Sequence, residues 1–147
     1  MGTTQVEYDA ALQQARTGFD EGGIPIGAAL WRDGQLLGVG RNRRMQQGSA
    51  ILHGEIDCLN TVGRLTDYRG TTLYTTLSPC SMCAGAIALF QIPEVIVGEA
   101  QTFPGEIEFL RERGVRVEVI DDPVATDLLA RFAANNPEAW SEDIGGR

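Results

Sequence analysis

Apolar positions along the chain change repeatedly between helical and strand-like spacing. Spacings of three and four residues predict helices, which we place at residues 6–19, 52–62, 80–90, 105–113 and 121–135. Short runs of apolar and β-branched residues predict strands, which we place at residues 24–31, 36–40, 71–77, 95–97 and 115–120. Residues 41–49 are expected to form a polar loop and residues 137–147 a C-terminal tail.

The order of these elements predicts an α/β fold. The Asp33-Gly34 pair between the first two strands is typical of a hairpin turn, so we expect these strands to form an antiparallel pair at an edge of the sheet. The later strands alternate with helices, which indicates a mostly parallel sheet covered by helices on both faces. Ser78 and Pro79 are expected to begin the helix after the third strand, as its cap and first turn. No repeat or linker divides the sequence, so we expect a single domain over residues 1–147.

Composition and charge exclude several classes of protein. No run approaches the roughly 20 apolar residues that a membrane-spanning helix needs, so no membrane partner is expected. The first residues have neither the basic nor the apolar segment of a signal peptide, so we expect a cytoplasmic location. The formal net charge of −8 disfavours nucleic acid, whose phosphates attract basic surfaces. Small neutral molecules or proteins are therefore the expected partners.

The chain has three cysteines, Cys58, Cys80 and Cys83, and one histidine, His53. An odd number of thiols without an export signal argues against a disulfide framework. Cys80 and Cys83 are three residues apart at the start of an expected helix, so they share a face on which the helix dipole favours thiolates. Together with His53 they make a three-ligand zinc set, which leaves the fourth tetrahedral position for water, as in catalytic sites.

Three other interpretations of these thiols stay open at this point. Cys58 could complete a closed four-ligand zinc site, although it lies one helical turn beyond Glu55 and we expect a buried thiol too deep to reach the metal. Cys80 and Cys83 also have the spacing of a redox dithiol, which does not explain a single histidine beside a carboxylate in another helix. A coincidental spacing is the third interpretation.

Glu55 is the residue that makes this set reactive. Residues two apart on a helix point about 200° apart, so His53 and Glu55 converge only if His53 lies at the helix entry. His-x-Glu combined with Pro-Cys-x-x-Cys is the signature of zinc deaminases, in which the glutamate moves protons and is not a metal ligand. The chain carries this signature as His53-Gly54-Glu55 and Pro79-Cys80-Ser81-Met82-Cys83.

The resemblance extends over nearly the whole chain. Besides the signature, the segments that carry it are Glu21–Gly27, Thr72–Cys80 and Trp140–Gly145. In these segments the chain resembles the fungal-type cytosine deaminases of the cytidine deaminase superfamily. The resemblance implies a three-layer α/β/α fold with a mixed five-stranded sheet, a homodimer, and conversion of cytosine to uracil and ammonia in pyrimidine salvage. It also implies one zinc ion per subunit, held by His53, Cys80 and Cys83, with Glu55 as the proton shuttle for attack by zinc-activated water.

The resemblance further implies which residues bind the substrate. They would be Ile26, Asn42, Gly54, Ser78, Phe103, Trp140 and Asp143. Asn42 would meet the ring carbonyl, and Asp143 would reach the amino group that leaves. Phe103 and Trp140 would wall the pocket. Because a small base on an open zinc site would leave one side in water, we expect residues 137–147 to cover it.

Other functions remain to be separated from this one. A deaminase of another small ring, such as creatinine, isocytosine or guanine, is the nearest alternative. A tRNA adenosine deaminase shares the signature but needs a basic face for the anticodon stem, which the net charge disfavours. A non-catalytic zinc-stabilised domain would have no use for Glu55 beside an open metal position.

Overall fold

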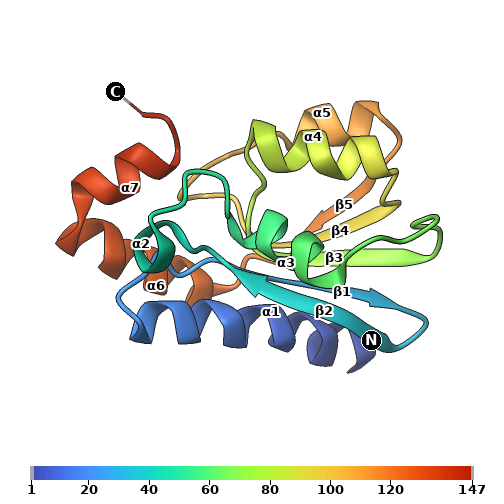
Figure 1. The fold of residues 1–147 in the computed structure, drawn as a ribbon, viewed down its shortest axis with the longest axis horizontal. Coiled ribbons are helices and arrows are strands. Elements are labelled where there is room, and N and C mark those ends of the chain that lie inside the picture. The colour runs from blue at the N-terminus through green and yellow to red at the C-terminus, as the bar shows by residue number, and fades with distance from the viewer. Residues whose placement is uncertain (1, 147) are drawn as a thin grey trace.

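The computed structural model describes residues 2–146 of the chain. The strands are β1 (Gly27–Arg32), β2 (Gln35–Arg41), β3 (Thr71–Leu77), β4 (Glu94–Glu99) and β5 (Arg116–Val119). The helices are α1 (Gly2–Asp20), α2 (Arg44–Gln47), α3 (Gly54–Val62), α4 (Ser81–Phe90), α5 (Ile107–Glu112), α6 (Pro123–Asn135) and α7 (Pro137–Asp143). The strands form one sheet, with α1 and α6 on one face and α3, α4 and α5 on the other (Figure 1).

The sheet has the order β2-β1-β3-β4-β5 and confirms the mixed five-stranded sheet between helical layers. β1 is antiparallel to both β2 and β3, whereas β3, β4 and β5 run parallel. Four of the five strands thus run in one direction and β1 alone runs against them, but two of the four strand pairings are antiparallel where the expected hairpin supplies one. The reason is that β1 lies between β2 and β3, the two strands that α3 connects, and so adds a second antiparallel pairing.

Alternate residues of the central strands point to opposite faces of the sheet. Leu73 of β3 packs with Ile87 in the layer of α3, α4 and α5. Its neighbour Tyr74 packs on the other face with Ile96 and with Tyr8 of α1. Both faces are thus buried, which holds the strand ends and the helix starts in fixed positions.

Two short helices lie where the sequence predicted none. Helix α2 occupies part of the expected loop at 41–49, and α7 occupies most of the expected tail at 137–147. Helix α2 has one apolar side chain, Met45, and α7 has the adjacent pair Ala139 and Trp140, so neither shows a helical spacing of apolar positions. Arg147, the last residue of that tail, lies outside the described residues.

The start of α4 also differs from the expectation. Cys80, and not Ser78, is the N-cap, with extended backbone angles of φ −73° and ψ 178°. The Ser78 hydroxyl instead donates a 2.7 Å hydrogen bond to the carbonyl of Pro104. A Cβ at Gly105 would lie 2.2 Å from Ser78 Oγ, and the φ of +63° there also requires glycine. The turn before α4 is therefore fastened to the loop that carries Phe103.

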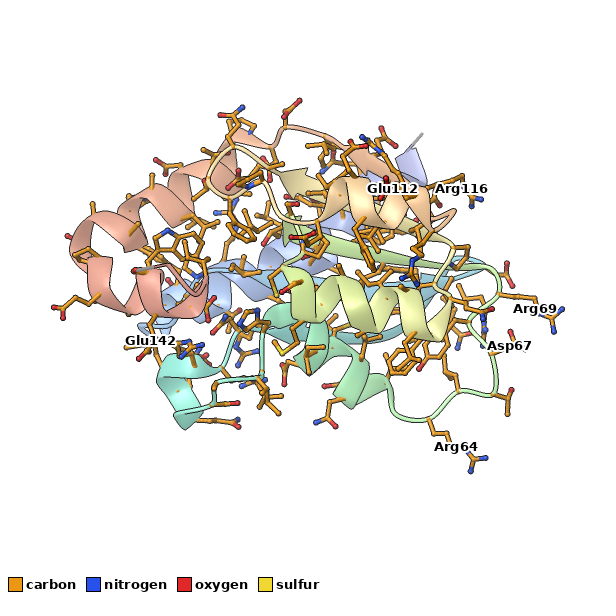
Figure 2. All side chains as sticks on the ribbon, turned by 90° about the horizontal axis from the view of Figure 1, so that it is seen from above. Arg64, Asp67, Arg69, Glu112, Arg116 and Glu142 are labelled. Carbon is orange, nitrogen blue, oxygen red and sulfur yellow. The ribbon has the colours of Figure 1, made fainter. Side chains whose placement is uncertain are left out.

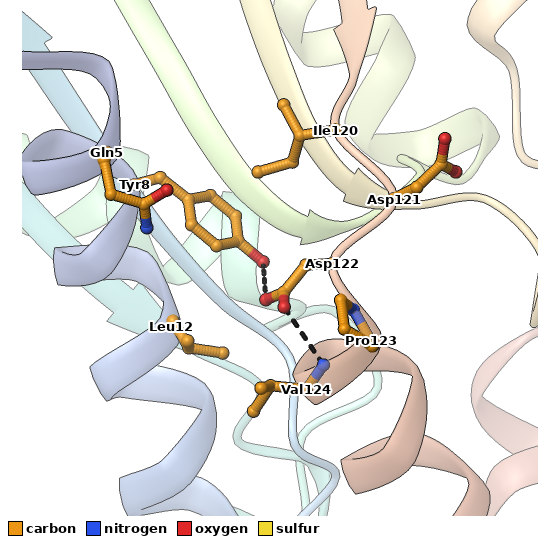
Figure 3. Close-up of a pocket in the computed structure, with 8 residues that line it drawn as sticks. All are labelled: Gln5, Tyr8, Leu12, Ile120, Asp121, Asp122, Pro123 and Val124. Carbon is orange, nitrogen blue, oxygen red and sulfur yellow. Dashed lines mark hydrogen bonds between the residues drawn. The ribbon is translucent and has the colours of Figure 1, made fainter. Parts of the chain in front are cut away.

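Helix α6 is fastened to α1 by its first turn (Figure 3). Asp122 caps α6 by accepting the Val124 N–H at 3.0 Å, and its other oxygen accepts the Tyr8 hydroxyl at 2.7 Å. Helix α7 follows α6 after a single residue, Asn136. Across residues 2–146, no helix is both long enough and apolar enough to span a membrane.

Candidate active site

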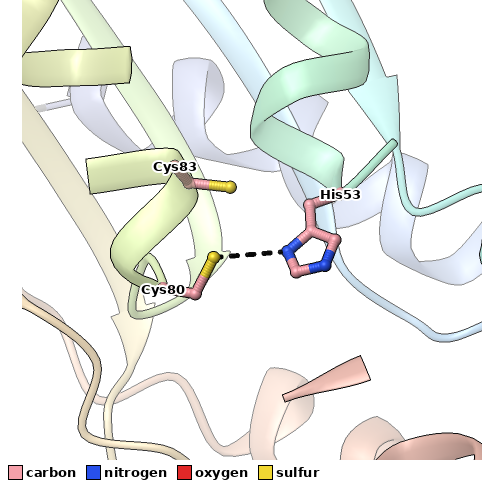
Figure 4. A group of neighbouring side chains, drawn as sticks. All are labelled: His53, Cys80 and Cys83. Atoms are coloured by element: carbon pink, nitrogen blue, oxygen red, sulfur yellow. Dashed lines mark hydrogen bonds between the residues drawn. The ribbon is translucent and has the colours of Figure 1, made fainter. Parts of the chain in front are cut away.

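Three side chains that could hold a metal ion, the metal-binding group, meet where α3 and α4 begin (Figure 4). His53 is the N-cap of α3, Cys80 is the N-cap of α4, and Cys83 lies in the first turn of α4. The ligand atoms of the three residues all lie within 4.8 Å of one another. His53 Nδ1 is 3.4 Å from Cys80 Sγ. The sequence motifs that predicted these three residues are thus brought to one point.

This set of donors fits a zinc ion. Zinc bonds of 2.0–2.3 Å in a tetrahedron separate the ligand atoms by roughly 3.5–3.8 Å, a spacing compatible with the observed group. Two thiolates and an imidazole are also donors that zinc prefers. Within residues 2–146, the group has no fourth protein ligand, so it has the open form typical of catalytic zinc sites.

The two thiols of the group differ in acidity. Hydrogen bonds from Cys83 and His53 lower the pKa of the Cys80 thiol to about 4, against the effect of burial. The same hydrogen bond to Cys80, together with burial, raises the pKa of Cys83 well above its ordinary value. These shifts favour the thiolate form at Cys80 and the protonated form at Cys83, and a metal held by both sulfurs would displace the Cys83 proton.

His53 presents one nitrogen to the thiols and the other to a carboxylate. Its Nε2 lies 3.4 Å from Asp143 Oδ1. Burial opposes the charged form of the ring, but the bond to Cys80 and the charges of Asp143 and Glu55 outweigh it and raise the pKa of His53 to about 9. A carboxylate behind a metal-binding histidine fixes the orientation of the ring and makes it a stronger ligand.

Glu55 lies beside the metal-binding group, in the first turn of α3, and is 4% exposed. Burial and the negative charge of Cys80 raise the pKa of Glu55 to about 7, against the lowering effect of His53. A carboxyl group with a pKa near neutrality can both accept and release protons. His53 does lie at the helix entry, as the sequence argument requires, and this position lets the two side chains line one cavity.

The cavity has a volume of about 20 Å³, which is room for about one water molecule. Its lining residues are Ile26, His53, Glu55, Leu77, Ser78, Cys80, Phe103, Asp143 and Ile144. Seven of these nine were predicted from the sequence. Leu77 and Ile144 were missed, although each directly adjoins a predicted residue, Ser78 or Asp143.

Three predicted substrate-binding residues, Asn42, Gly54 and Trp140, are not among the residues that line this cavity. Trp140 and Phe103 pack against the apolar cluster that contains Ile26. Gly54 lies against the backbone of Ile26, because a Cβ at this position would be 3.0 Å from the Ile26 carbonyl oxygen. Asn42 is fully buried beside Asp143.

Both ends of the Asn42 amide are engaged. Its Oδ1 accepts the Arg44 N–H at 2.9 Å, and its Nδ2 donates to the two oxygens of Asp143 at 3.1 and 3.2 Å. Arg44 Nε also donates to Asp143, at 2.8 Å. Sequence analysis missed Arg44, and its only signal there is its position two residues after Asn42.

Cys58 lies outside the metal-binding group. It is fully buried and its thiol donates to the carbonyl of Gly38 at 3.5 Å. Burial raises the pKa of this thiol to about 12. These features agree with a buried, protonated thiol and not with a fourth zinc ligand.

Comparison with known proteins identifies the family. Residues 2–99 match the model of the cytidine and deoxycytidylate deaminase zinc-binding region. The chain belongs to this deaminase family. The matched range contains His53, Glu55, Cys80 and Cys83, so the recognised signature and the family assignment agree. The resemblance stated from the sequence is thereby confirmed, and the chain is a deaminase.

Individual members of the deaminase family extend the comparison. The chain is 48% identical over 138 residues to a cytosine deaminase of Candida albicans, a match that covers 92% of each protein. It is 38% identical over 106 residues to a tRNA-specific adenosine deaminase of Streptococcus pyogenes serotype M1, covering 68% of this chain and 60% of the relative. The solved guanine deaminase of Nitrosomonas europaea shares the fold, with a TM-score of 0.72 and 21% identity over 87% of this chain and 83% of that one.

Proposed function

We propose that this deaminase hydrolyses free cytosine to uracil and ammonia. The observation that carries the proposal is the cavity shared by an open three-ligand group and the buried Glu55. The 48% identity to a cytosine deaminase over 92% of the chain supports cytosine as the base. A cytoplasmic location and a place in pyrimidine salvage belong to the same proposal.

His53, Cys80 and Cys83 would hold one zinc ion per subunit. When bound, zinc lowers the pKa of a coordinated water to about 7 and so supplies a nucleophile at neutral pH. Glu55 takes a proton from the water and delivers it to the ring nitrogen beside the amino-bearing carbon, which makes that carbon more electrophilic. The oxygen of the water would then bond to this carbon, and Glu55 would take the remaining proton of that oxygen and pass it to the amino nitrogen. The carbon–nitrogen bond then breaks, and ammonia leaves as the ring carbonyl forms.

The other proposed residues hold the base. Asn42 would contact the ring carbonyl through Nδ2, which carries two N–H donors that are directed to Asp143 in this structure, while the Arg44 N–H holds its Oδ1. Asp143 would accept a hydrogen bond from the departing amine. The other proposed contacts are Ile26, Gly54, Ser78, Phe103 and Trp140.

We also propose that residues 1–147 are one domain whose last segment, 137–147, covers the bound base. Asp143 and Ile144 from this segment line the cavity. With room for about one water, the cavity cannot admit a base until part of its lining moves, and we propose that this part is residues 137–147. The segment would therefore open for entry and release, and close to exclude water during the reaction.

A homodimer completes the proposal, and the face of α3 and α4 suits a second copy of the chain. A groove there is lined mainly by apolar side chains, including Ile56, Leu65, Tyr68 and Phe90. Leu89, at the end of α4, is 74% exposed. A second copy would remove these apolar surfaces from water. Sedimentation of the protein and of a Leu89→Glu variant would measure this association.

A panel of substrates tests the proposed reaction. Ammonia release would be followed with cytosine, isocytosine, creatinine, guanine and a tRNA anticodon stem-loop, with Glu55→Gln as the inactive control. We expect the highest kcat/KM with cytosine and no turnover of the RNA, which the net charge of −8 repels. If the enzyme prefers another ring compound, the proposed substrate is wrong but the proposed deamination reaction stands. No ammonia from any compound by zinc-loaded protein would overturn the proposed reaction.

A further inference from the structure

We propose that Arg44 is a positioning residue that holds α7 closed over the metal-binding group. It would thereby set how often the site opens for entry of the base and release of the product. The inference rests on the proposed function for the reaction that this closure serves, and on the geometry of Arg44 for the closure itself.

The guanidinium of Arg44 joins three segments of the chain. Its Nε donates to Asp143 at 2.8 Å and its Nη1 donates to Glu142 at 3.1 Å, both at the end of α7. Its Nη2 donates to the carbonyl of Ala50 at 3.4 Å, in the loop that leads to His53. Figure 2 shows Glu142 on the edge of α7 that faces α2, the helix that Arg44 begins. One side chain therefore bridges the covering helix and the loop before the metal-binding group.

Burial makes the bond to Asp143 the more important of the two. The side chain of Asp143 is 2% exposed, whereas that of Glu142 is 67% exposed. A carboxylate buried this deeply is stable only with a charged partner and further hydrogen bonds. Asn42 contributes a neutral donor, so Arg44 supplies the permanent positive charge.

Apart from Asp143, helix α7 is held by Ala139 and Trp140, which are half-buried against the apolar cluster of Ile26 and Leu129. Among its residues 137–143, all of which the structure describes, Asp143 is the one buried residue. Because Asp143 also lines the cavity, a movement of α7 that admits a base must break the bonds from Arg44. The same movement withdraws the carboxylate from His53 Nε2 and from the Asn42 amide. Closure thus restores the orientation of both residues in one step.

Hydrogen exchange of the zinc-loaded protein without any base measures the opening directly. In Arg44→Ala we expect the amides of α7 to exchange at least tenfold faster than in the parent, with the amides of β3 and β4 unchanged. Arg43→Ala is the matched control, because it removes the neighbouring guanidinium, which pairs with Asp57 of α3 and not with α7. Exchange in α7 should stay at the parent rate in this control.

Two further variants keep the test decisive if Arg44→Ala does not fold. Arg44→Lys keeps the charge but cannot reach Asp143 and Glu142 with one planar group, and Glu142→Gln removes the exposed partner alone. We expect about threefold faster exchange in Arg44→Lys and a smaller increase in Glu142→Gln.

Kinetics give a second readout. In Arg44→Ala, KM should rise at least tenfold while kcat stays within threefold, because a looser helix weakens binding but speeds release. Exchange in α7 within twofold of the parent in Arg44→Ala, or in Arg44→Lys if only that variant folds, would overturn the proposal. So would equally faster exchange in Arg43→Ala. Since exchange needs no substrate, a wrong assignment of the base would leave this result intact.

Discussion

The active site has two halves that are held in place by different interactions. The metal half, His53, Glu55, Cys80 and Cys83, lies at the starts of α3 and α4, which are packed on the sheet by a buried core. The covering half, residues 137–146, is joined to the site through Asp143 and through partly buried apolar contacts. We therefore expect the metal half to be as stable as the fold itself, and the proposed covering half to separate while the sheet stays intact.

The largest effect is expected from removing a ligand in the metal half. Cys80→Ala should lose zinc and all activity, because two remaining ligands do not hold the metal at catalytic affinity. The free energy of unfolding should fall too, by about 2.7 kcal/mol where the parent is measured with zinc at 100 times its Kd. Cys58→Ser is the matched control and should keep its zinc. Elemental analysis that finds full zinc in Cys80→Ala would contradict the ligand assignment.

Removing the proton carrier should affect the reaction without affecting the metal. Glu55→Gln should retain zinc, since Glu55 is not a ligand, and should lose turnover by about 10²–10⁴-fold, the range of general acid–base catalysis. Ammonia release and zinc content, measured on the same sample, check both parts. Activity within tenfold of the parent would show that another group moves the protons.

The same division explains what could be predicted from the sequence. The metal half depends on local spacing, because His-x-Glu and Cys-x-x-Cys each place their side chains within one helical turn. The contacts of the covering half join residues about 100 positions apart, as between Arg44 and Asp143. No local pattern encodes such a pairing, so Asp143 was found only by resemblance and Arg44 was not found.

The fold shows the same limit. Hydrophobic spacing predicted all five strands, because each carries its own apolar run. The position of β1 between β2 and β3 depends on which strands pair, and that is decided by packing across the whole sheet. Helices α2 and α7 were not predicted because neither carries apolar side chains at helical spacing.

Deleting most of the covering half, from Trp140 onward, should reduce activity less than the largest loss expected for Glu55→Gln. A chain that ends before Trp140 should fold and keep zinc, because the core and the metal half lie outside the deleted segment. Its kcat/KM should fall at least about 100-fold, since the bound base is left open to water. Circular dichroism, zinc analysis and steady-state kinetics separate these outcomes. Normal turnover by the truncated protein would mean that the segment only packs on the surface.

The smallest effect is expected from weakening the attachment of α6, the helix that precedes the covering half. Tyr8→Phe removes the hydroxyl that donates to Asp122, the cap of α6, and α6 carries α7. Loss of one such hydrogen bond should lower the free energy of unfolding by about 1 kcal/mol near neutral pH. Zinc content and turnover should stay close to those of the parent, because the metal half is not touched.

The difference in unfolding free energy between the parent and Tyr8→Phe should depend on pH, and this dependence tests whether the Tyr8 proton causes the difference. Burial and the bond to Asp122 raise the pKa of folded Tyr8 well above its ordinary value near 10. Above pH 10 the unfolded chain therefore loses this proton while the folded chain keeps it, so the stabilisation is complete below pH 10 and declines above it. The chain has no lysine, so the other groups that titrate there are tyrosines and cysteines common to both proteins. Urea unfolding from pH 7 to 11 should show the parent losing its advantage over Tyr8→Phe above pH 10. A constant difference across this range would mean that the hydroxyl contributes by packing and not through its proton.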